Sequence, residues 1–408
     1  MKSWTLSNSM KAVICSVNIQ EIVSVGMFFH VGSQNETENT NGITHLLEHV
    51  LSDQFLDYCS RSGGRSNALT TKEYCCFFSK CSNRKIEPIL KCFRRICDGI
   101  YSETDILRAK KMVINEMQDL DAEQSLDQQI FEVHLVGDPL RFLPIGKREN
   151  IERISANDIH SHFENYIQPS HCVLSIVGCI DENEGINIVE RIFSDWYGTS
   201  KQTGQGHPVL PPQEKMHRLL ISDSTTSSLR ILFDGTGRAS NNKAAYSLLC
   251  NFLGGGTHSQ LFKHVRQKWS MAYNAFCVPQ FFSHKGIIYL KIVGTADKST
   301  VVIDKINELM LSLADQDIHP ADIERCKMSL IEDHIFKHET LSSKMTLFGQ
   351  QLLLEGRIST DKDIINAINQ VEPEEIKIGL NHILSGNITM LLDPSAEIGR
   401  RYFNHIFI

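Results

Sequence analysis

The stretch NGITHLLEHVLSD, residues 41–53, combines an apolar stripe with two histidines and a glutamate. His45, Glu48 and His49 share one face of the helix that this spacing predicts, and the i, i+4 separation brings both imidazoles within reach of one zinc ion. Glu48 is then placed to act as a general base beside that metal. The same pattern also suits an ordinary helix with a solvated polar edge. The neighbouring buried face is predicted at Ile43, Leu46, Leu47, Val50 and Leu51.

The composition is that of an ordinary globular protein. The 408 residues are enough for two or three domains, and 41% of them are hydrophobic. A net charge of −7 and the lack of a basic block argue against nucleic acid as a partner. No apolar run approaches the ~18 residues of a membrane span, and the first residues lack the apolar core of a signal peptide. We therefore expect a cytoplasmic protein that does not bind membranes.

The twelve cysteines predict reduced thiols, since the chain has no secretory features. The densest cluster is CCFFSKC, residues 75–81. It lacks a CxxC pair and lies in a strand-like apolar run, which favours core packing over a metal knuckle.

The order of predicted elements favours mixed α+β layers. A long helix is expected over residues 102–124, with Ser102 and Asp105 in capping-box positions. The Gly- and Pro-rich segment 198–215 predicts a linker between an N-terminal domain, 1–197, and a C-terminal domain, 216–408. Strands are expected at Lys11–Val17, Ile22–Val31, Val173–Val177, Leu229–Phe233, Ile287–Val293 and Ile388–Leu392.

The two halves show signs of duplication. The helix starting DILRAK at Asp105 has a counterpart, DIERCK, at Asp322, and Ile114 and Ile331 share the same offset of 217. Together with the central linker, this predicts two related α/β-layer domains, each an antiparallel-rich sheet with helices packed on one face.

The motif's context resembles the inverzincin zinc peptidases, the family of pitrilysin, insulin-degrading enzyme and the mitochondrial processing peptidase, and within it the short bacterial members. The resemblance rests on Gly32, Glu36 and Gly42 around the HxxEH motif and on GGRSNALT, residues 63–70. VINEM, residues 113–117, resembles the segment that supplies the family's third zinc ligand, which would be Glu116.

The second half carries a separate block. LGGGTHSQLFKHVRQKWSMAY, residues 253–273, resembles the segment whose arginine and tyrosine hold substrate and transition state in this family. The resemblance thus implies roles for Arg266 and Tyr273, and substrate contacts for Asn67 and Ala68. The chain departs from the family in its spacing, since only 66 residues separate His49 from Glu116. It also has Ala109 where a second glutamate is common, and Ser270 and Met271 where the family has a glycine and a leucine.

Alternatives remain for several of these residues. Asp119 and Glu123 lie one and two turns beyond Glu116 and compete with it as third ligand. Arg266 and Tyr273 also suit a surface arginine and a half-buried strand residue. Asn67 also suits a turn after two glycines.

The expected function is that of a zinc-dependent endopeptidase with one Zn²⁺ per chain, held by His45, His49 and Glu116. By resemblance, two chains, either identical or related, close into a chamber that admits unfolded peptides, including precursor peptides awaiting maturation. A non-catalytic scaffold or binding subunit of a heterodimeric peptidase is the rival. Such relatives usually lose one of the two motif blocks, and both are intact in this sequence.

Overall fold

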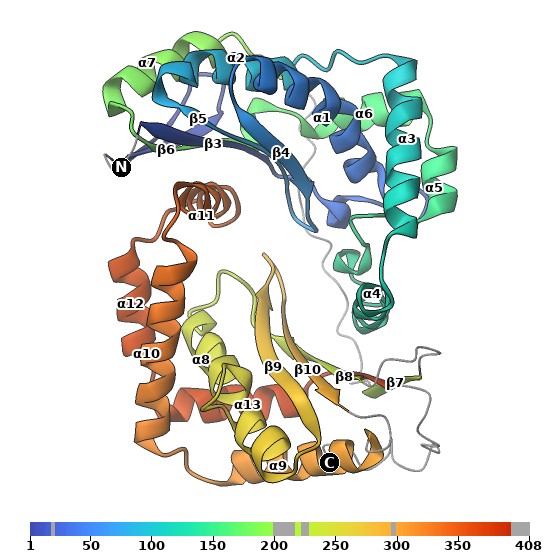
Figure 1. Ribbon diagram of the computed structural model, residues 1–408, viewed down its shortest axis with the longest axis vertical. Helices are drawn as coiled ribbons and strands as arrows, with labels where there is room; N and C mark the ends of the chain where they lie inside the picture. Colours follow the sequence, from blue (N-terminus) through green and yellow to red (C-terminus); the bar gives the residue numbers. More distant parts are fainter. Residues whose placement is uncertain (18–20, 199–216, 222–227, 295–298, 393–408) are drawn as a thin grey trace. The chain divides into compact units, whose positions relative to one another are not determined.

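The computed structural model describes residues 1–17, 21–198, 217–221, 228–294 and 299–392 (Figure 1). The predicted linker lies outside these ranges, apart from Gly198. The chain forms two compact units, and each contains a segment from the other half of the sequence. The first unit is Met1–Leu120, Asp138–Gly206 and Lys337–Ile358, and the second is Asp121–Gly137, His207–Phe336 and Ser359–Ile408.

The first unit is built on a six-stranded sheet with the order β1-β2-β6-β3-β5-β4. Only β2 and β6 pair in parallel, and β4 lies at one edge. The strands are β1 (Lys2–Thr5), β2 (Lys11–Ser16), β3 (Ile22–Phe29), β4 (Arg65–Thr70), β5 (Cys75–Ser82) and β6 (Cys172–Gly178). The helices are α1 (Ile43–Arg61), α2 (Ile86–Ile96), α3 (Glu103–Gln118), α5 (Arg148–Arg153), α6 (Ala156–Tyr166), α7 (Glu182–Phe193) and α11 (Leu341–Leu354).

The second unit is built on a five-stranded sheet with the order β7-β11-β8-β10-β9. Its strands are β7 (His217–Ile221), β8 (Ser228–Gly235), β9 (Ala272–Phe281), β10 (Gly286–Gly294) and β11 (Ile388–Leu392). Its helices are α4 (Ala122–His134), α8 (Lys243–Gly254), α9 (Ser299–Asp315), α10 (Pro320–Lys337), α12 (Asp361–Asn369) and α13 (Pro373–Ser385), and a π-helical turn covers Phe262–Lys268.

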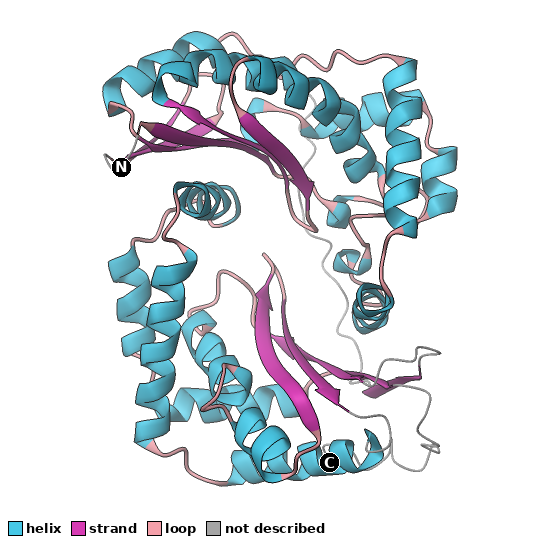
Figure 2. Ribbon diagram, viewed as in Figure 1, coloured by secondary structure: helices cyan, strands magenta, loops and turns pink. Residues whose placement is uncertain are grey.

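The two sheets share one topology, which supports the predicted duplication. Numbered from β2 in the first unit and from β7 in the second, both have the strand order 1-5-2-4-3, with only strands 1 and 5 parallel. The secondary-structure colouring shows helices layered against each sheet (Figure 2). The α+β prediction with two related layered domains is therefore confirmed.

Each sheet is also covered on its second face, by a helix that comes from the other half of the chain. In the first unit, α11 packs on β3 and β6, opposite the face that α1 and α2 cover (Figure 1). The approach is close: a methyl group added at Gly349 would overlap the ring of Phe28. The sequence analysis expected helices on one face only, because nothing local in α11 reveals which sheet it joins.

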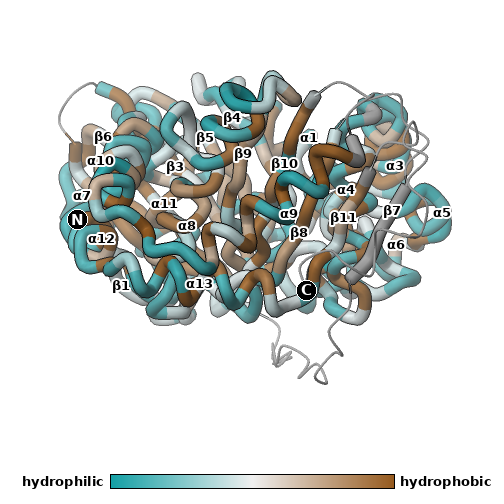
Figure 3. Tube along the Cα trace, turned by 90° about the horizontal axis from the view of Figure 1, so that it is seen from below, coloured by the Kyte–Doolittle hydropathy of each residue, from teal (hydrophilic) through white to brown (hydrophobic). Residues whose placement is uncertain are grey.

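In the second unit, α4 covers the sheet through charged groups. Arg230 on β8 is fully buried and donates to Asp127 at 2.5 Å and to Glu123 at 2.6 Å. Lys291 on β10 lies 2.7 Å from Glu123, and the Tyr289 hydroxyl donates to Asp127. The opposite face of the same sheet carries the apolar core under α8, and Figure 3 shows hydrophobic stretches along strands such as β10.

All six predicted strands are present, although their ends shift by up to two residues. The predicted helix over 102–124 is wrong at its end. Its capping box at Ser102 and Asp105 forms as expected, but α3 ends at Gln118. Asp121 then caps a new helix, α4, by accepting a hydrogen bond from the Gln124 N–H, and this helix joins the second unit.

The cysteines behave as predicted within the described residues. All twelve are free thiols. Cys75, Cys76 and Cys81 are buried along β5, where they pack in the sheet. No described helix is both long and apolar enough to cross a membrane.

Candidate metal centre

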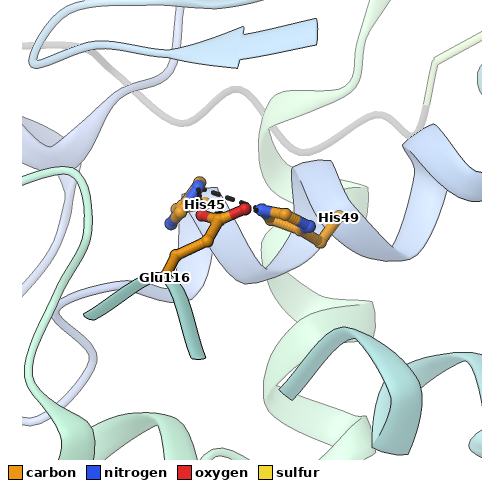
Figure 4. Close-up of side chains that lie close together, drawn as sticks. All are labelled: His45, His49 and Glu116. Atoms are coloured by element: carbon orange, nitrogen blue, oxygen red, sulfur yellow. Dashed lines mark hydrogen bonds and ion pairs between the residues drawn. The ribbon is translucent and has the colours of Figure 1, made fainter. Parts of the chain in front are cut away.

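The HxxEH residues lie on the first two turns of α1, as the periodicity predicts. The Nε2 atoms of His45 and His49 are 3.1 Å apart. The Glu116 carboxylate, from the last turn of α3, lies 3.5 Å from His45 Nε2 and 3.4 Å from His49 Nε2. Figure 4 shows the three side chains pointing toward one another. Among the described residues, they form the one group of three or more potential metal ligands.

The separations between these atoms fit a zinc ion. Ligand atoms about 2.0–2.2 Å from a tetrahedral zinc lie about 3.3–3.5 Å from one another. The two distances to the Glu116 carboxylate, 3.5 and 3.4 Å, fall within this range, and the 3.1 Å between the imidazoles is slightly shorter. A small movement of one imidazole would therefore complete the arrangement, with the helices in place. Two imidazoles and one carboxylate are also the ligand set of many catalytic zinc sites, which leave a position for substrate or water.

Glu48 lies beside these three residues rather than among them. Its nearest carboxylate oxygen is 3.9 Å from His45 Nε2 and accepts a hydrogen bond from the Thr70 hydroxyl at 3.4 Å. The side chain is buried, with 6% of its surface exposed. Thr70 is the last residue of β4 and of the GGRSNALT segment. The segment expected to contact substrate therefore also contacts Glu48, through a residue that the sequence analysis did not single out.

Burial shifts the protonation equilibria of the centre. It lowers the pKa of His45 to about 4, with a smaller contribution from the charge of His49. His45 is therefore a neutral imidazole at neutral pH, the form that binds a metal ion. Burial, followed by repulsion from Glu116, raises the pKa of Glu48 to about 8. A divalent cation nearby would oppose that rise.

The imidazole nitrogens that face away from the candidate metal position have fewer hydrogen-bond partners than in many metal sites. The Nδ1 atoms of His45 and His49 are buried, and no described protein group accepts a hydrogen bond from either. Such atoms usually donate to a carboxylate or carbonyl. Ala109, which stands where the resemblance expects a glutamate, is buried in the core and offers no acceptor.

The structure separates Glu116 from its two rivals. Asp119 is the exposed C-cap residue of α3. Glu123 belongs to the second unit and pairs with Arg230 and Lys291. Of the three acids, Glu116 is the one that faces both histidines.

Asn67 and Ala68 lie on β4, the edge strand whose last residue touches Glu48. Asn67 is exposed, and its Oδ1 accepts a hydrogen bond from the Ala68 N–H at 2.9 Å. Asn67 is therefore part of a strand and not of the turn that the alternative interpretation assumed.

Arg266 and Tyr273 belong to the second unit. Arg266 is exposed on the π-helical turn, and its guanidinium carbon lies 4.9 Å from the centre of the Phe262 ring. Tyr273 is 66% exposed on β9. Between them, Ser270 adopts a φ of 52°, a left-handed conformation that explains why the family prefers glycine at this position.

Two family models match the sequence, one over its first part and one over its second. Residues 12–147 match the family "Insulinase (Peptidase family M16)", and residues 153–330 match "Peptidase M16 inactive domain". This chain belongs to peptidase family M16. The recognition made from the HxxEH context is confirmed, and the metal group lies entirely within the part that matches the insulinase domain.

Curated M16 relatives are similar along nearly their whole length. "Uncharacterized zinc protease YmxG" of Bacillus subtilis is 24% identical over 98% of this chain and 99% of the relative. An "Uncharacterized zinc protease" of Rickettsia felis is 22% identical over 97% and 96% of the two chains.

Solved structures share the fold. A protease from Helicobacter pylori superposes with a TM-score of 0.86 at 20% identity, covering 96% of this chain and 98% of the other. A chain of complex III2 from Candida albicans gives a TM-score of 0.84 at 17% identity, covering 100% and 98%.

Proposed function

We propose that this chain is a zinc-dependent endopeptidase that cleaves peptides in an extended conformation. The observation that carries the proposal is the convergence of His45, His49 and Glu116, with Glu48 buried alongside. The names of its relatives as zinc proteases support the choice of metal. His45, His49 and Glu116 would hold one zinc ion per chain.

When bound there, zinc would polarise the scissile carbonyl and acidify a water molecule. Glu48 takes the proton of that water and later transfers it to the leaving amine. The Thr70 hydroxyl, 3.4 Å from the Glu48 carboxylate, keeps that carboxylate oriented while it exchanges the proton. Glu48 is therefore the general base and acid, and not a fourth ligand.

β4 supports an extended substrate. It is an edge strand of the first unit's sheet, and it ends at Thr70, beside Glu48. A peptide that adds to such an edge forms main-chain hydrogen bonds that do not depend on its sequence. Asn67 and Ala68 would contact the peptide, and the scissile bond would lie near the end of the strand.

A direct test compares cleavage of an unfolded peptide by the wild type and by Glu48→Gln. We expect the variant to keep its zinc and to lose at least about 100-fold in kcat/KM, because the amide cannot accept the proton. Chelation should abolish wild-type cleavage, and added zinc should restore it. Wild-type rates in Glu48→Gln would contradict the proposed role of Glu48.

By resemblance, Arg266 and Tyr273 serve the metal centre of a second copy, in a dimeric chamber that excludes folded proteins. Glu48→Gln alone and Tyr273→Phe alone should then be nearly inactive. After subunit exchange, half of the dimers are mixed and each has one intact site, so activity should recover to about 25% of wild type. No recovery after proven exchange would mean that Arg266 and Tyr273 serve the metal within their own chain or have no catalytic role.

The second candidate is a non-catalytic subunit of a larger complex, because the same fold occurs in a chain of complex III2. Zinc-dependent cleavage by the isolated chain would exclude that role as its main function. Binding of an extended peptide without zinc and without cleavage would favour it.

A further inference from the structure

The N-cap residue of α1 cannot cap the helix with its own side chain. That residue is Gly42, with a φ of 103°, so no side chain is available to accept the free N–H groups of the first turn. Gly42 is also closely surrounded: a methyl group added there would lie 2.7 Å from the Ile151 side chain and 3.0 Å from the backbone of Gly146. The space for a local cap is therefore taken, and the cap must come from elsewhere.

Glu36, six residues upstream, supplies it. One carboxylate oxygen accepts from the Gly42 N–H at 2.7 Å and from the Asn41 side-chain amide at 2.8 Å. The other oxygen accepts from the Thr44 N–H at 2.9 Å. The side chain is buried, with 6% of its surface exposed. A carboxylate in this place satisfies several donors at once and is favoured by the helix dipole.

A second buried group supports this cap. The Thr44 hydroxyl lies 3.0 Å from Nε2 of His162 on α6, within hydrogen-bonding distance. The same residue donates its N–H to Glu36, so Thr44 is held through both its backbone and its side chain. Thr44 and His162 are both buried.

We propose that Glu36, Thr44 and His162 form a positioning network that holds the first turn of α1 and thereby aims His45 at the metal. The inference rests on the proposed zinc site. His45 follows Thr44 directly and is the third residue of the helix, where fraying has its largest effect. His49 lies a full turn further on, so loss of the network should misplace one ligand and spare the other.

The test measures zinc affinity by chelator competition and the absorption spectrum of the cobalt-substituted protein. Glu36→Gln should weaken zinc binding about ten-fold, as typically happens when a group that orients a ligand is lost. It should also shift the cobalt bands, because the position of His45 changes. The matched control is Asp181→Asn: Asp181 caps α7 by accepting from the Asn183 and Glu184 N–H groups, both at 2.9 Å. That variant should lower the melting temperature without changing zinc affinity or the bands.

A second pair of variants covers the case in which Glu36→Gln does not fold. Thr44→Val keeps the shape but removes the hydroxyl, and should weaken zinc binding, whereas Thr44→Ser should retain it. Wild-type zinc affinity in Glu36→Gln, or in Thr44→Val if Glu36→Gln does not fold, would overturn the network while leaving the zinc site intact. A wild type that binds no zinc would instead overturn the proposed function.

Discussion

Helices α1 and α8 occupy the same place in two units with the same strand order, yet only α1 has the side chains to hold a metal. Counted from the first residue of each helix, the third, sixth and seventh positions are His45, Glu48 and His49 in α1. In α8 they are Ala245, Leu248 and Leu249, all buried in the apolar core.

The helices packed next to them differ in the same way. α3 brings Glu116 to the histidines, whereas α10, its counterpart in the duplication, meets α8 through an Asn251–Ser329 hydrogen bond of 3.4 Å. A buried carboxylate lowers the free energy of unfolding because it loses its hydration. A leucine buried in the same place raises the free energy of unfolding, because its apolar surface is removed from water. The second unit therefore shows what the first gives up in stability for its chemistry.

The largest effect on stability should come from placing a glutamate in α8, at the position equivalent to Glu48 in α1. Leu248→Glu puts a carboxylate into a site with no exposed surface, and we expect it to lower the free energy of unfolding by about 4 kcal/mol. Thermal unfolding measures this, with Ser247→Glu, on a half-exposed neighbouring position, as the mild control. If Leu248→Glu lowered the free energy of unfolding as little as the mild control does, the α8 site would tolerate a charge.

A slightly smaller effect concerns the exchanged helix of the second unit. Arg230→Met removes the buried cation that pairs with both Glu123 and Asp127, and should cost about 3 kcal/mol. Arg325→Ala, on the exposed side of α10, is the control and should change stability by less than about 0.5 kcal/mol. If Arg230→Met unfolds like the wild type in denaturant, the ion network does not hold α4 in place.

The reverse exchange should stabilise the first unit. Glu48→Leu introduces the α8 residue into α1 and should raise the unfolding free energy of the metal-free protein by about 1–2 kcal/mol while removing activity. Glu116→Leu should bring no such gain, because Glu116 is 47% exposed. A destabilised Glu48→Leu would mean that the polar face of α1 is needed for folding as well as for chemistry.

The smallest effect separates backbone strain from chemistry. Ser270→Gly relieves a left-handed conformation and should stabilise the protein by about 1 kcal/mol or less, with peptide cleavage unchanged. A clear change in kcat/KM, measured on the same peptide, would give the Ser270 hydroxyl a catalytic role that we do not assign to it.

The sequence was sufficient wherever a local pattern decides the structure. The i, i+4 spacing predicted the shared face of His45 and His49, and the capping box at Ser102 predicted the start of α3. Glu116 came from the resemblance alone, because its contact with α1 joins residues more than sixty positions apart.

Contacts between distant segments could not be predicted from local patterns. The Thr44–His162 hydrogen bond spans 118 residues, and the sequence analysis expected a role for neither residue. The exchange of α4 and α11 between the units could not be predicted for the same reason. An amphipathic pattern predicts that a helix buries one face, but it does not indicate against which sheet. From the sequence alone, Arg230 would be expected at the surface, because its partners Glu123 and Asp127 on α4 lie more than 100 residues away.

Anomalous diffraction at the zinc edge, on crystals of the wild type purified without chelator, tests the central claim most directly. We predict one peak per chain within about 2.2 Å of Nε2 of His45, Nε2 of His49 and a carboxylate oxygen of Glu116. The absence of a peak at that point in zinc-supplemented crystals, with the two imidazoles hydrogen-bonded to each other instead, would contradict the account.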